Sequence, residues 1–464
     1  MKMMNEPKQM HLQEKIFLLL RQQILDGALS SGTRLLPSRV MAEELGVSRN
    51  TVLVAVERLV AEGYVVAKTG SGCYVNDNVA LGTNATASLG AIAPTGFMPY
   101  RSDIVDFKSG LPDLSVFPVK RFGQLYRDVM DHITPAELGY GAPEGHIELR
   151  REIATYLQTY RGVRCDPASI LITSGTTQAI GIAGSALFEG QSHPLAVIEN
   201  PITVDIRRIL QKLGAEIYPV PTDQWGLCTS ALPSHKAPRC IYVTPSHQYP
   251  LGAILSAKRR VKLIEYAQKS NCYIVEDDYD SEYRFDGHPI SAVQGLCPKR
   301  VIYIGTFSKT LSPALRIGYL VLPPSLIAGA RQMKWLTDLH NSVFDQLVLA
   351  RFIRGGHYYR HLMKMKKRYR SKRDFLLACL QQHMGERAKI IGENAGLHLC
   401  VQFPGVVFSK NLLDNLEQAG VRVYPVWEHA GTDTSFDDTI ILGFGMLSPE
   451  KIDKGIGILK QILL

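Results

Sequence analysis

The feature that most constrains the fold is a series of short apolar runs between residues 170 and 323, separated by segments with helical periodicity. The runs are ILIT (170–173), LAVIEN (195–200), CIYVTP (240–245), CYIVEDD (272–278), VIYIGT (301–306) and GYLVLP (318–323). Such alternation is typical of an α/β domain with a mostly parallel central sheet. Ligands of these sheets bind at the carboxyl ends of the strands, where the unusual residues of this sequence also lie.

A different pattern occupies the N-terminal residues. The segment HLQEKIFLLLRQQILDGAL places apolar residues at helical spacing and predicts a helix that ends at Asp26-Gly27. A second helix is predicted over 38–45, and Ser48 is positioned to cap a third. Two alternating strands in YVVAKTGSGCYV (64–75) flank a glycine-containing tip and predict a β-hairpin.

Three helices followed by a hairpin, together with the motif LGVSRNTV…L…EGY, resemble the winged helix-turn-helix of GntR-family bacterial repressors over residues 10–76. In a helix-turn-helix, the second helix of the motif, which is the third predicted helix of this chain, enters the major groove with its first turn. There arginine reads guanine and hydroxyl groups hold phosphate. The resemblance implies double-stranded promoter DNA as a partner. The DNA contacts that it implies are Arg39, Ser48, Arg49, Thr51 and Gly70.

Two strand ends in the larger part carry polar segments. In TSGTTQAI (173–180), Gly175 and Thr176 open a helix, whose N-terminus suits either a phosphate or an ordinary hydroxyl cap. In YIVEDDYDSEYR (273–284), two acids end a strand. A buried carboxylate needs a partner, and a protonated heterocycle nitrogen would supply one. Tyr279, two residues after Asp277, is then near enough to form a hydrogen bond with a phenolic oxygen of such a heterocycle. The plain alternative for this segment is an ordinary acidic turn. The lack of nearby histidines argues against a metal site.

The third strand end leads into GTFSKTLSPALRIGYL (305–320), where a single lysine, Lys309, stands among hydroxyl and apolar residues. An amine in such surroundings can have a lowered pKa and attack an aldehyde, although a lone lysine is more often a surface residue. Arg316, seven positions later, is suited to clamp a phosphate. Together the three segments supply a phosphate cradle, an acid for a ring nitrogen, a phenol and an amine, which pyridoxal 5′-phosphate requires.

Residues 104–464 resemble fold type I aminotransferases, and LGYGAPEGHIELRREIATYL (138–157) and TPSHQYPLGAILS (244–256) strengthen the match. With the GntR-like head, the chain resembles the MocR subfamily of pyridoxal-phosphate-dependent transcriptional regulators. The resemblance implies that Lys309 forms the internal aldimine, that Asp277 faces the pyridine nitrogen and that Tyr279 faces the 3′-oxygen. It further implies a phosphate site and a homodimer. The residues around the phosphate would be Gly175, Thr176, Ser308 and Arg316.

The domain organisation follows from composition. Residues 77–103 are small and polar without a period, which predicts a flexible linker, and the aminotransferase-like part divides into a large subdomain (about 140–330) and a small one (about 331–464). No run approaches the roughly 20 apolar residues of a membrane span. The eight cysteines form no CxxC pair, so neither a disulfide framework nor a metal site is expected, and we expect a cytoplasmic protein.

Three positions depart from aminotransferases. Ile441 stands in DDTIILGFG where an arginine usually binds the substrate carboxylate, Thr203 replaces an aromatic ring, and Tyr249 replaces an asparagine. We therefore expect a regulator that senses pyridoxal phosphate or an amine effector, without physiological transamination. The alternatives are an aminotransferase with an appended DNA-binding domain and a repressor with a cofactor-free scaffold. The basic segment 351–373 is either a solvated helix face or an auxiliary DNA surface.

Overall fold

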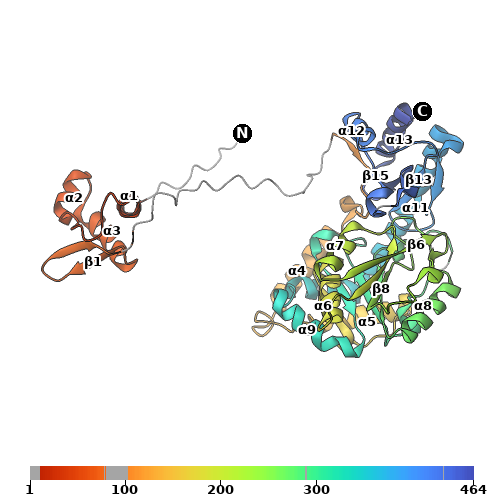
Figure 1. Cartoon of the computed structure of the whole chain (residues 1–464), viewed down its shortest axis with the longest axis horizontal. Helices are drawn as coiled ribbons and strands as arrows, with labels where there is room; N and C mark the ends of the chain where they lie inside the picture. Colours follow the sequence, from red (N-terminus) through yellow and green to blue (C-terminus); the bar gives the residue numbers. More distant parts are fainter. Residues whose placement is uncertain (1–10, 78, 80–102, 288–289, 432, 464) are drawn as a thin grey trace. The chain divides into compact units, whose positions relative to one another are not determined.

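The computed structural model describes residues 11–77, 79, 103–287, 290–431 and 433–463. The chain divides into two compact units, Met1–Pro99 and Tyr100–Leu464, each with its own core (Figure 1). In the first unit, α1 (Leu12–Leu25), α2 (Ser38–Glu44) and α3 (Arg49–Ala61) precede an antiparallel hairpin of β1 (Val65–Lys68) and β2 (Gly72–Val75). Phe17, Ile24, Val52 and Leu59 are among its buried residues. The expected winged helix is confirmed.

An eight-stranded sheet forms the centre of the second unit. Its order is β4-β11-β10-β9-β8-β5-β6-β7. The strands are β4 (Ile170–Thr173), β5 (Leu195–Asn200), β6 (Glu216–Asp223), β7 (Gly226–Leu227), β8 (Cys240–Val243), β9 (Tyr273–Asp278), β10 (Val301–Thr306) and β11 (Gly318–Val321). β11 is antiparallel to both β4 and β10, and β7 is antiparallel to β6. The other strands run in one direction, so the expectation of a mostly parallel sheet is confirmed.

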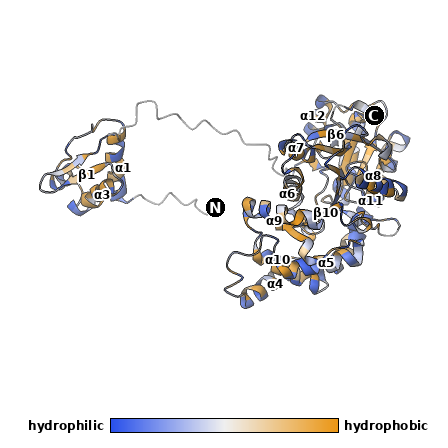
Figure 2. Ribbon diagram, turned by 60° about the horizontal axis from the view of Figure 1, so that its bottom comes forward, coloured by the Kyte–Doolittle hydropathy of each residue, from blue (hydrophilic) through white to orange (hydrophobic). Residues whose placement is uncertain are grey.

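Both faces of this sheet are buried, which explains why its strands are continuous apolar runs. Along β10, Ile302 and Ile304 join the hydrophobic cluster under α6 (Thr176–Phe188), while Val301 and Tyr303 join clusters on the opposite face. Several strands of this unit are accordingly orange in Figure 2. The helices that follow the strands are α6, α7 (Val204–Lys212), α8 (Ala257–Lys269) and α9 (Pro324–Asp338).

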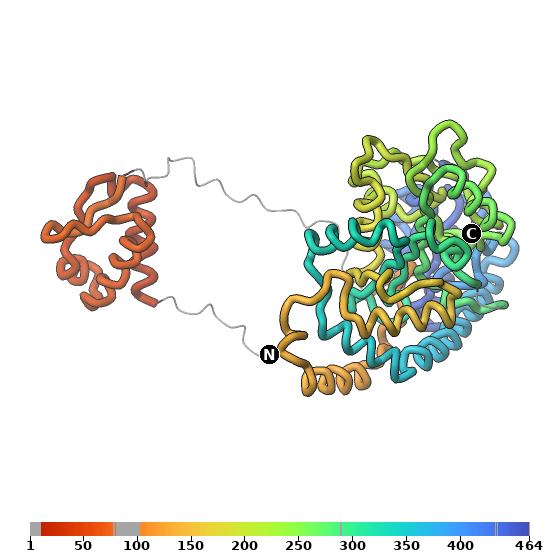
Figure 3. The backbone as a smooth tube through the Cα atoms, turned by 90° about the horizontal axis from the view of Figure 1, so that it is seen from below, coloured from red at the N-terminus to blue at the C-terminus, as the bar shows by residue number. Residues whose placement is uncertain are grey.

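The C-terminal part has its own four-stranded sheet, with the order β12-β13-β16-β15. These strands are β12 (Lys389–Ile391), β13 (His398–Gln402), β15 (Tyr424–Pro425) and β16 (Thr439–Gly443). The helices around it and in the rest of the unit are α4 (Val119–His132), α5 (Ile147–Arg161), α10 (Val343–Arg354), α11 (His357–Met384), α12 (Lys410–Gln418) and α13 (Pro449–Leu463). Figure 3 traces α11 as one long helix at the edge of this unit.

The first segment of the second unit returns to this C-terminal part. β3 (Val105–Asp106) pairs in parallel with β14 (Val421–Arg422). Further along, a Cβ on Gly443 would lie 2.2 Å from the carbonyl oxygen of Lys108, so only glycine allows the two backbones to approach this closely. The segment after residue 105 is thereby held beside the small sheet. Among the described residues, no helix is long and apolar enough to cross a membrane.

Candidate functional site: a cavity at the strand ends

A cavity of about 250 Å³ opens where parallel strands of the large sheet end. Residues after the carboxyl ends of β4, β5, β8, β9 and β10 contribute to its wall, as expected for an α/β sheet. Its lining residues are Gly110, Thr176, Thr177, Ile202, Thr203, Asp205, Ile206, Ile209, Tyr242, Thr244, Tyr249, Asp277, Tyr279, Lys309 and His398. Four of the residues predicted to bind the cofactor, Thr176, Asp277, Tyr279 and Lys309, are thus brought together.

Lys309 follows β10 and projects its amine into this cavity. Burial lowers the pKa of Lys309, although the carboxylates of Asp280 and Asp277 oppose this effect. The segment before α4 approaches the amine closely: a Cβ on Gly110 would lie 2.8 Å from Lys309 Nζ. A partly desolvated amine with a lowered pKa is the form of lysine that acts as a nucleophile.

Asp277 lies near the end of β9 and is the acid of this strand that lines the cavity. Its neighbours Glu276 and Asp278 point to the other face of the sheet, because side chains alternate along a strand. Glu276 accepts hydrogen bonds from the backbone N–H groups of Val293 and Gln294, and Asp278 pairs with Arg161 at 2.7 Å. The order of acids in the sequence therefore leaves one carboxylate for a ligand.

The carboxylate of Asp277 has an unused acceptor. Tyr242 donates its hydroxyl to Oδ2, whereas Oδ1 is buried and has no hydrogen-bond partner among the described residues. Burial is the main cause that raises the pKa of Asp277 to about 7. A protonated ring nitrogen would satisfy Oδ1 and return the carboxylate to its charged form, so these residues fit pyridoxal phosphate.

Three of the four predicted phosphate residues, Gly175, Thr176 and Arg316, meet at the N-terminus of α6. Gly175 is its N-cap with φ of 104°, a conformation that favours glycine. A Cβ on Gly175 would lie 3.6 Å from Nη1 and Nη2 of Arg316, so the guanidinium group faces this helix end. Thr176 begins the helix and lines the cavity. Ser308 accepts a hydrogen bond from the Thr306 hydroxyl at 3.1 Å and lies beside Lys309, outside the set of lining residues.

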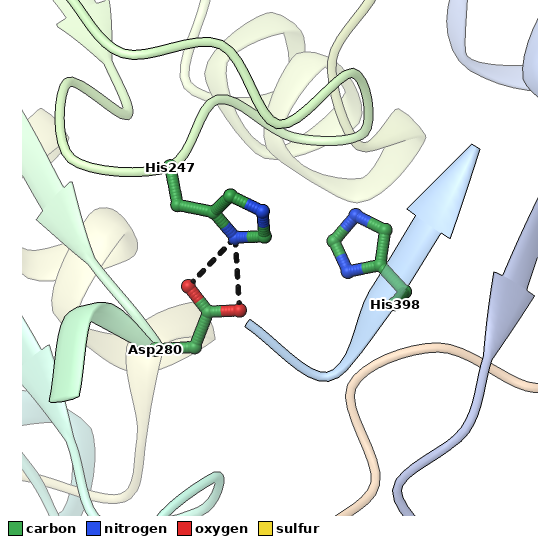
Figure 4. A group of neighbouring side chains, drawn as sticks. All are labelled: His247, Asp280 and His398. Atoms are coloured by element: carbon green, nitrogen blue, oxygen red, sulfur yellow. Dashed lines mark hydrogen bonds and ion pairs between the residues drawn. The ribbon is translucent and has the colours of Figure 1, made fainter. Parts of the chain in front are cut away.

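A cluster of two histidines and an aspartate was missed by the sequence analysis (Figure 4). His247 Nδ1 lies 3.0 Å from both carboxylate oxygens of Asp280 and 3.0 Å from the hydroxyl of Tyr279. The ring of His398, from β13, is 5.1 Å from the His247 ring. The assumption that no histidine lies near the acidic strand end was wrong, since chain segments distant in sequence converge here.

The three departures from aminotransferases fall into two groups. Thr203 and Tyr249 line the cavity. The Tyr249 hydroxyl lies 3.0 Å from Ser109 Oγ, and burial raises the pKa of Tyr249 to about 12. Ile441 instead packs in a buried apolar cluster with Cys400 and Val426 and does not line the cavity. An isoleucine there stabilises the small sheet and offers nothing to a carboxylate.

In the first unit, Ser48 caps α3 as predicted: its hydroxyl accepts a hydrogen bond from the backbone N–H of Thr51 at 3.2 Å. Arg49 is exposed and donates from Nε to Ser38 Oγ at 3.2 Å, which ties it to the preceding helix. Arg39 is exposed on α2. Gly70 lies at the hairpin tip with φ of 73°. The predicted DNA contacts thus lie on the two helices and the hairpin of a helix-turn-helix with a wing.

The basic segment 351–373 is largely neutralised by neighbouring groups. Five of its ten cations pair with carboxylates: Arg351, Arg354, Arg368, Lys372 and Arg373. Arg360 and Arg370 donate to backbone carbonyl oxygens. The whole segment lies within the described residues. Its remaining cations, which make neither kind of contact there, are Lys364, Lys366 and Lys367. This favours the solvated helix face over an auxiliary DNA surface.

Comparisons with known proteins agree with both units. Residues 102–428 match the family model "Aminotransferase class I and II", and residues 12–75 match "Bacterial regulatory proteins, gntR family". The probable rhizopine catabolism regulatory protein MocR of Rhizobium meliloti is 33% identical, over 98% of this chain and 94% of its own. The pyridoxine biosynthesis regulator PdxR of Corynebacterium glutamicum is 30% identical, over 92% of this chain and 90% of its own.

Among solved structures, the kynurenine aminotransferase of Pyrococcus horikoshii is similar to the second unit. Its TM-score is 0.72 at 29% identity, over 78% of this chain and 91% of that enzyme. The class I and II aminotransferase match supports the expected cofactor, pyridoxal 5′-phosphate. Both domain types, in this order and over nearly the whole length of the relatives, place the sequence in one family. The chain belongs to the MocR subfamily of GntR-type transcriptional regulators.

Proposed function

We propose that the protein regulates transcription by binding promoter DNA through its winged helix and by sensing pyridoxal phosphate, or an amine that reacts with it, in the cavity of the second unit. The DNA contacts are Arg39, Ser48, Arg49, Thr51 and Gly70, which belong to α2, α3 with its cap, and the hairpin. The similarity to PdxR, a pyridoxine biosynthesis regulator, supports a vitamin-derived effector. A promoter as the target implies a cytoplasmic protein.

One observation carries the cofactor assignment: Lys309 lines one cavity with Asp277, whose Oδ1 has no hydrogen-bond partner in the described part of the chain. Pyridoxal phosphate supplies an aldehyde for an amine and an electron-withdrawing ring. Asp277 Oδ1 would accept the proton of the ring nitrogen, and Lys309 Nζ would hold the aldehyde carbon. Tyr279 would donate to the 3′-oxygen. The phosphate would be held by Gly175, Thr176, Ser308 and Arg316.

An amine effector has room beside the cofactor cavity. A second cavity of about 390 Å³ shares Thr203 and Asp205 with the first and continues to Arg208, Glu428 and His429. Because Ile441 lies in an apolar cluster, the usual carboxylate clamp has no counterpart at that position. This favours sensing over transamination, although the 29% identity to a kynurenine aminotransferase keeps catalysis as the second candidate.

We also propose a homodimer. Tyr140 and Leu336 are 82% and 71% exposed, and Leu138 and Trp335 are exposed as well. The Tyr140 ring lies 6.3 Å from the His340 ring, near the end of the helix that carries Leu336, so these apolar side chains border one region. Large exposed apolar groups that gather on one surface mark interaction sites, and a twofold axis is the commonest way to cover them.

The test combines chemistry with DNA binding. Purified protein is titrated with pyridoxal phosphate while its visible absorbance is recorded, and borohydride reduction followed by peptide mapping locates the modified lysine. A promoter-fragment shift assay is run with and without the cofactor and candidate amines. Modification of Lys309, with a change in promoter affinity, supports the proposal. A modified lysine elsewhere, or none, would overturn the cofactor assignment, and steady conversion of an amino donor and a keto acid would favour the enzyme.

A further inference from the structure

The pair His247–Asp280 lies behind Tyr279 and outside the cofactor cavity. Both residues are almost completely buried, at 2% exposure each. Neither residue lines the cavity, whereas Tyr279 does. We infer that His247 and Asp280 are positioning residues that direct the hydroxyl proton of Tyr279 into the cavity. The inference rests on the proposed function, in which Tyr279 bonds the 3′-oxygen of pyridoxal phosphate.

The direction of the proton follows from the three groups that meet at His247 Nδ1. The two oxygens of Asp280 and the hydroxyl of Tyr279 all lie 3.0 Å from this nitrogen. An ionised carboxylate only accepts hydrogen bonds, so Nδ1 carries the ring proton and donates it to Asp280. Because Nδ1 carries this proton, it has no lone pair with which to accept a hydrogen bond from Tyr279. The hydroxyl oxygen of Tyr279 therefore faces an N–H group, and the hydroxyl proton of Tyr279 must point in another direction.

The direction left for this proton is the cavity, which Tyr279 lines together with Lys309 and Asp277. The other ring nitrogen of His247 agrees with the same tautomer. Nε2 is buried and has no hydrogen-bond partner among the described residues. An unpaired buried nitrogen is costly as a donor or as an acceptor, so no partner at Nε2 competes with the tautomer that Asp280 imposes at Nδ1. In the neutral ring the proton is therefore on Nδ1.

The surrounding structure holds the pair in place. A Cβ on Gly396 would lie 2.2 Å from His247 Cε1 and 2.4 Å from Asp280 Oδ2, so the backbone before β13 covers the pair directly. His398 donates from Nε2 to the carbonyl oxygen of Pro250 at 3.0 Å, and its ring packs against His247. A cation bound by His247, Asp280 and His398 would compete with these protein hydrogen bonds. The geometry is that of a hydrogen-bonded pair locked by its neighbours.

The test measures the pH at which the visible absorbance of the bound cofactor changes. A hydrogen bond donated to the 3′-oxygen withdraws negative charge, so its loss makes the cofactor hold a proton more tightly. Tyr279→Phe should raise the midpoint pH of this absorbance change by about one unit, which is a tenfold increase in the proton affinity of the bound cofactor. Asp280→Asn frees the tautomer of the His247 ring, and His247→Gln replaces the ring by an amide whose oxygen can accept, so either change lets Tyr279 donate backwards. The midpoint should rise by about threefold in proton affinity in His247→Gln. It should rise by less in Asp280→Asn, which also removes a carboxylate that raises the pKa of Lys309.

A double-mutant comparison separates positioning from general damage. In a Tyr279→Phe background, His247→Gln, which leaves the carboxylate of Asp280 in place, should add no further shift, because the proton that His247 directs is gone. The other ionisable groups around Tyr279 and Lys309 are unchanged in every variant. They are Asp277, Glu199, Tyr249, His398 and Lys108. His383→Gln is the matched control, since His383 also bonds an aspartate, Asp453, at 3.0 Å without a tyrosine, and it should leave the midpoint at the wild-type value.

Two results would overturn the inference while leaving the proposed function intact. One is an unchanged midpoint in His247→Gln, even if stability or cofactor occupancy falls. The other is an equal shift with and without the tyrosine hydroxyl. A wild-type protein that shows no visible band with pyridoxal phosphate would instead overturn the proposed function and, with it, this role for the pair.

Discussion

Tyr242 donates its hydroxyl to one carboxylate oxygen of Asp277, and the second oxygen of Asp277 is buried without a hydrogen-bond partner among the described residues. A half-satisfied buried carboxylate is costly, and proteins keep such groups where a ligand completes them. The donor from Tyr242 fixes the orientation of the carboxylate, so the free oxygen is held in place before any ligand binds. This arrangement makes the site selective for a ring that can present a protonated nitrogen.

The first prediction concerns the stability of the cofactor-free protein. Burial raises the pKa of Asp277 from 3.8 to about 7, so the folded state holds a proton that the unfolded state releases. The contribution of Asp277 to the free energy of unfolding should be greatest below about pH 4 and fall as the pH rises towards about 7. Asp277→Asn cannot ionise and should remove roughly 2–4 kcal/mol of this fall, as measured by urea denaturation at several pH values.

Glu199 and Glu276 also have pKa values raised by burial to about 7, so part of the pH dependence should persist in Asp277→Asn. Saturating pyridoxal phosphate should reduce the fall in the wild-type protein, because a ring N–H favours the charged carboxylate. An identical pH dependence in the wild-type and variant proteins would show that Asp277 is solvated and not poised for a ligand.

The second prediction separates sensing from DNA binding. Lys309→Ala should abolish the visible band of the attached cofactor and the effect of the effector on promoter affinity. Basal promoter affinity should stay within about twofold of the wild-type value, since that binding belongs to the winged helix. The measurement is a promoter-fragment shift assay with and without effector. Lys299→Ala, at a lysine of the same unit outside the cavity, is the control, and an effector response that survives in Lys309→Ala would contradict the sensing role.

Much of the fold and several site residues could be predicted from local sequence signals. The Ser48 cap, the glycine at the hairpin tip and the buried strands that lead to Asp277 and Lys309 each depend on short-range chemistry. β6 was missed because Pro219 and Pro221 interrupt its strand pattern, although the strand pairs in parallel with β5. The reversed direction of β11 could not be read from its apolar composition, which is the same for a parallel strand.

The parts that could not be predicted depend on long-range packing. Gly110 reaches Lys309, and His398 reaches His247, only because the segment after residue 105 and β13 both return to the strand ends. Each of these residues has an ordinary local sequence context. What marks them as site residues is a close backbone approach or a buried polar contact, and both are visible only in the tertiary structure.

The third prediction tests the DNA-reading helix. Arg49→Ala should weaken specific promoter binding by about 1–3 kcal/mol if Arg49 contacts a base. Ser38→Ala should weaken it less, because it removes only the hydrogen bond at 3.2 Å that orients Arg49 Nε. Binding is measured by fluorescence anisotropy against the promoter and against a scrambled duplex. Equal losses on both duplexes would assign Arg49 to phosphate rather than to a base.

The fourth prediction decides between the two interpretations of the basic segment 351–373. The other seven cations of the segment are held by carboxylates and carbonyl groups, so Lys364, Lys366 and Lys367 are the ones to test. Their simultaneous replacement by alanine should leave both promoter affinity and its salt dependence unchanged, because lysines on a solvated helix face make no phosphate contacts. If these lysines bound phosphates, the slope of log affinity against log salt would fall by about one for each lysine–phosphate interaction removed. The measurement is a salt titration of promoter binding, with Lys299→Ala as the control. A slope reduced by about two or three would establish a DNA surface on the second unit.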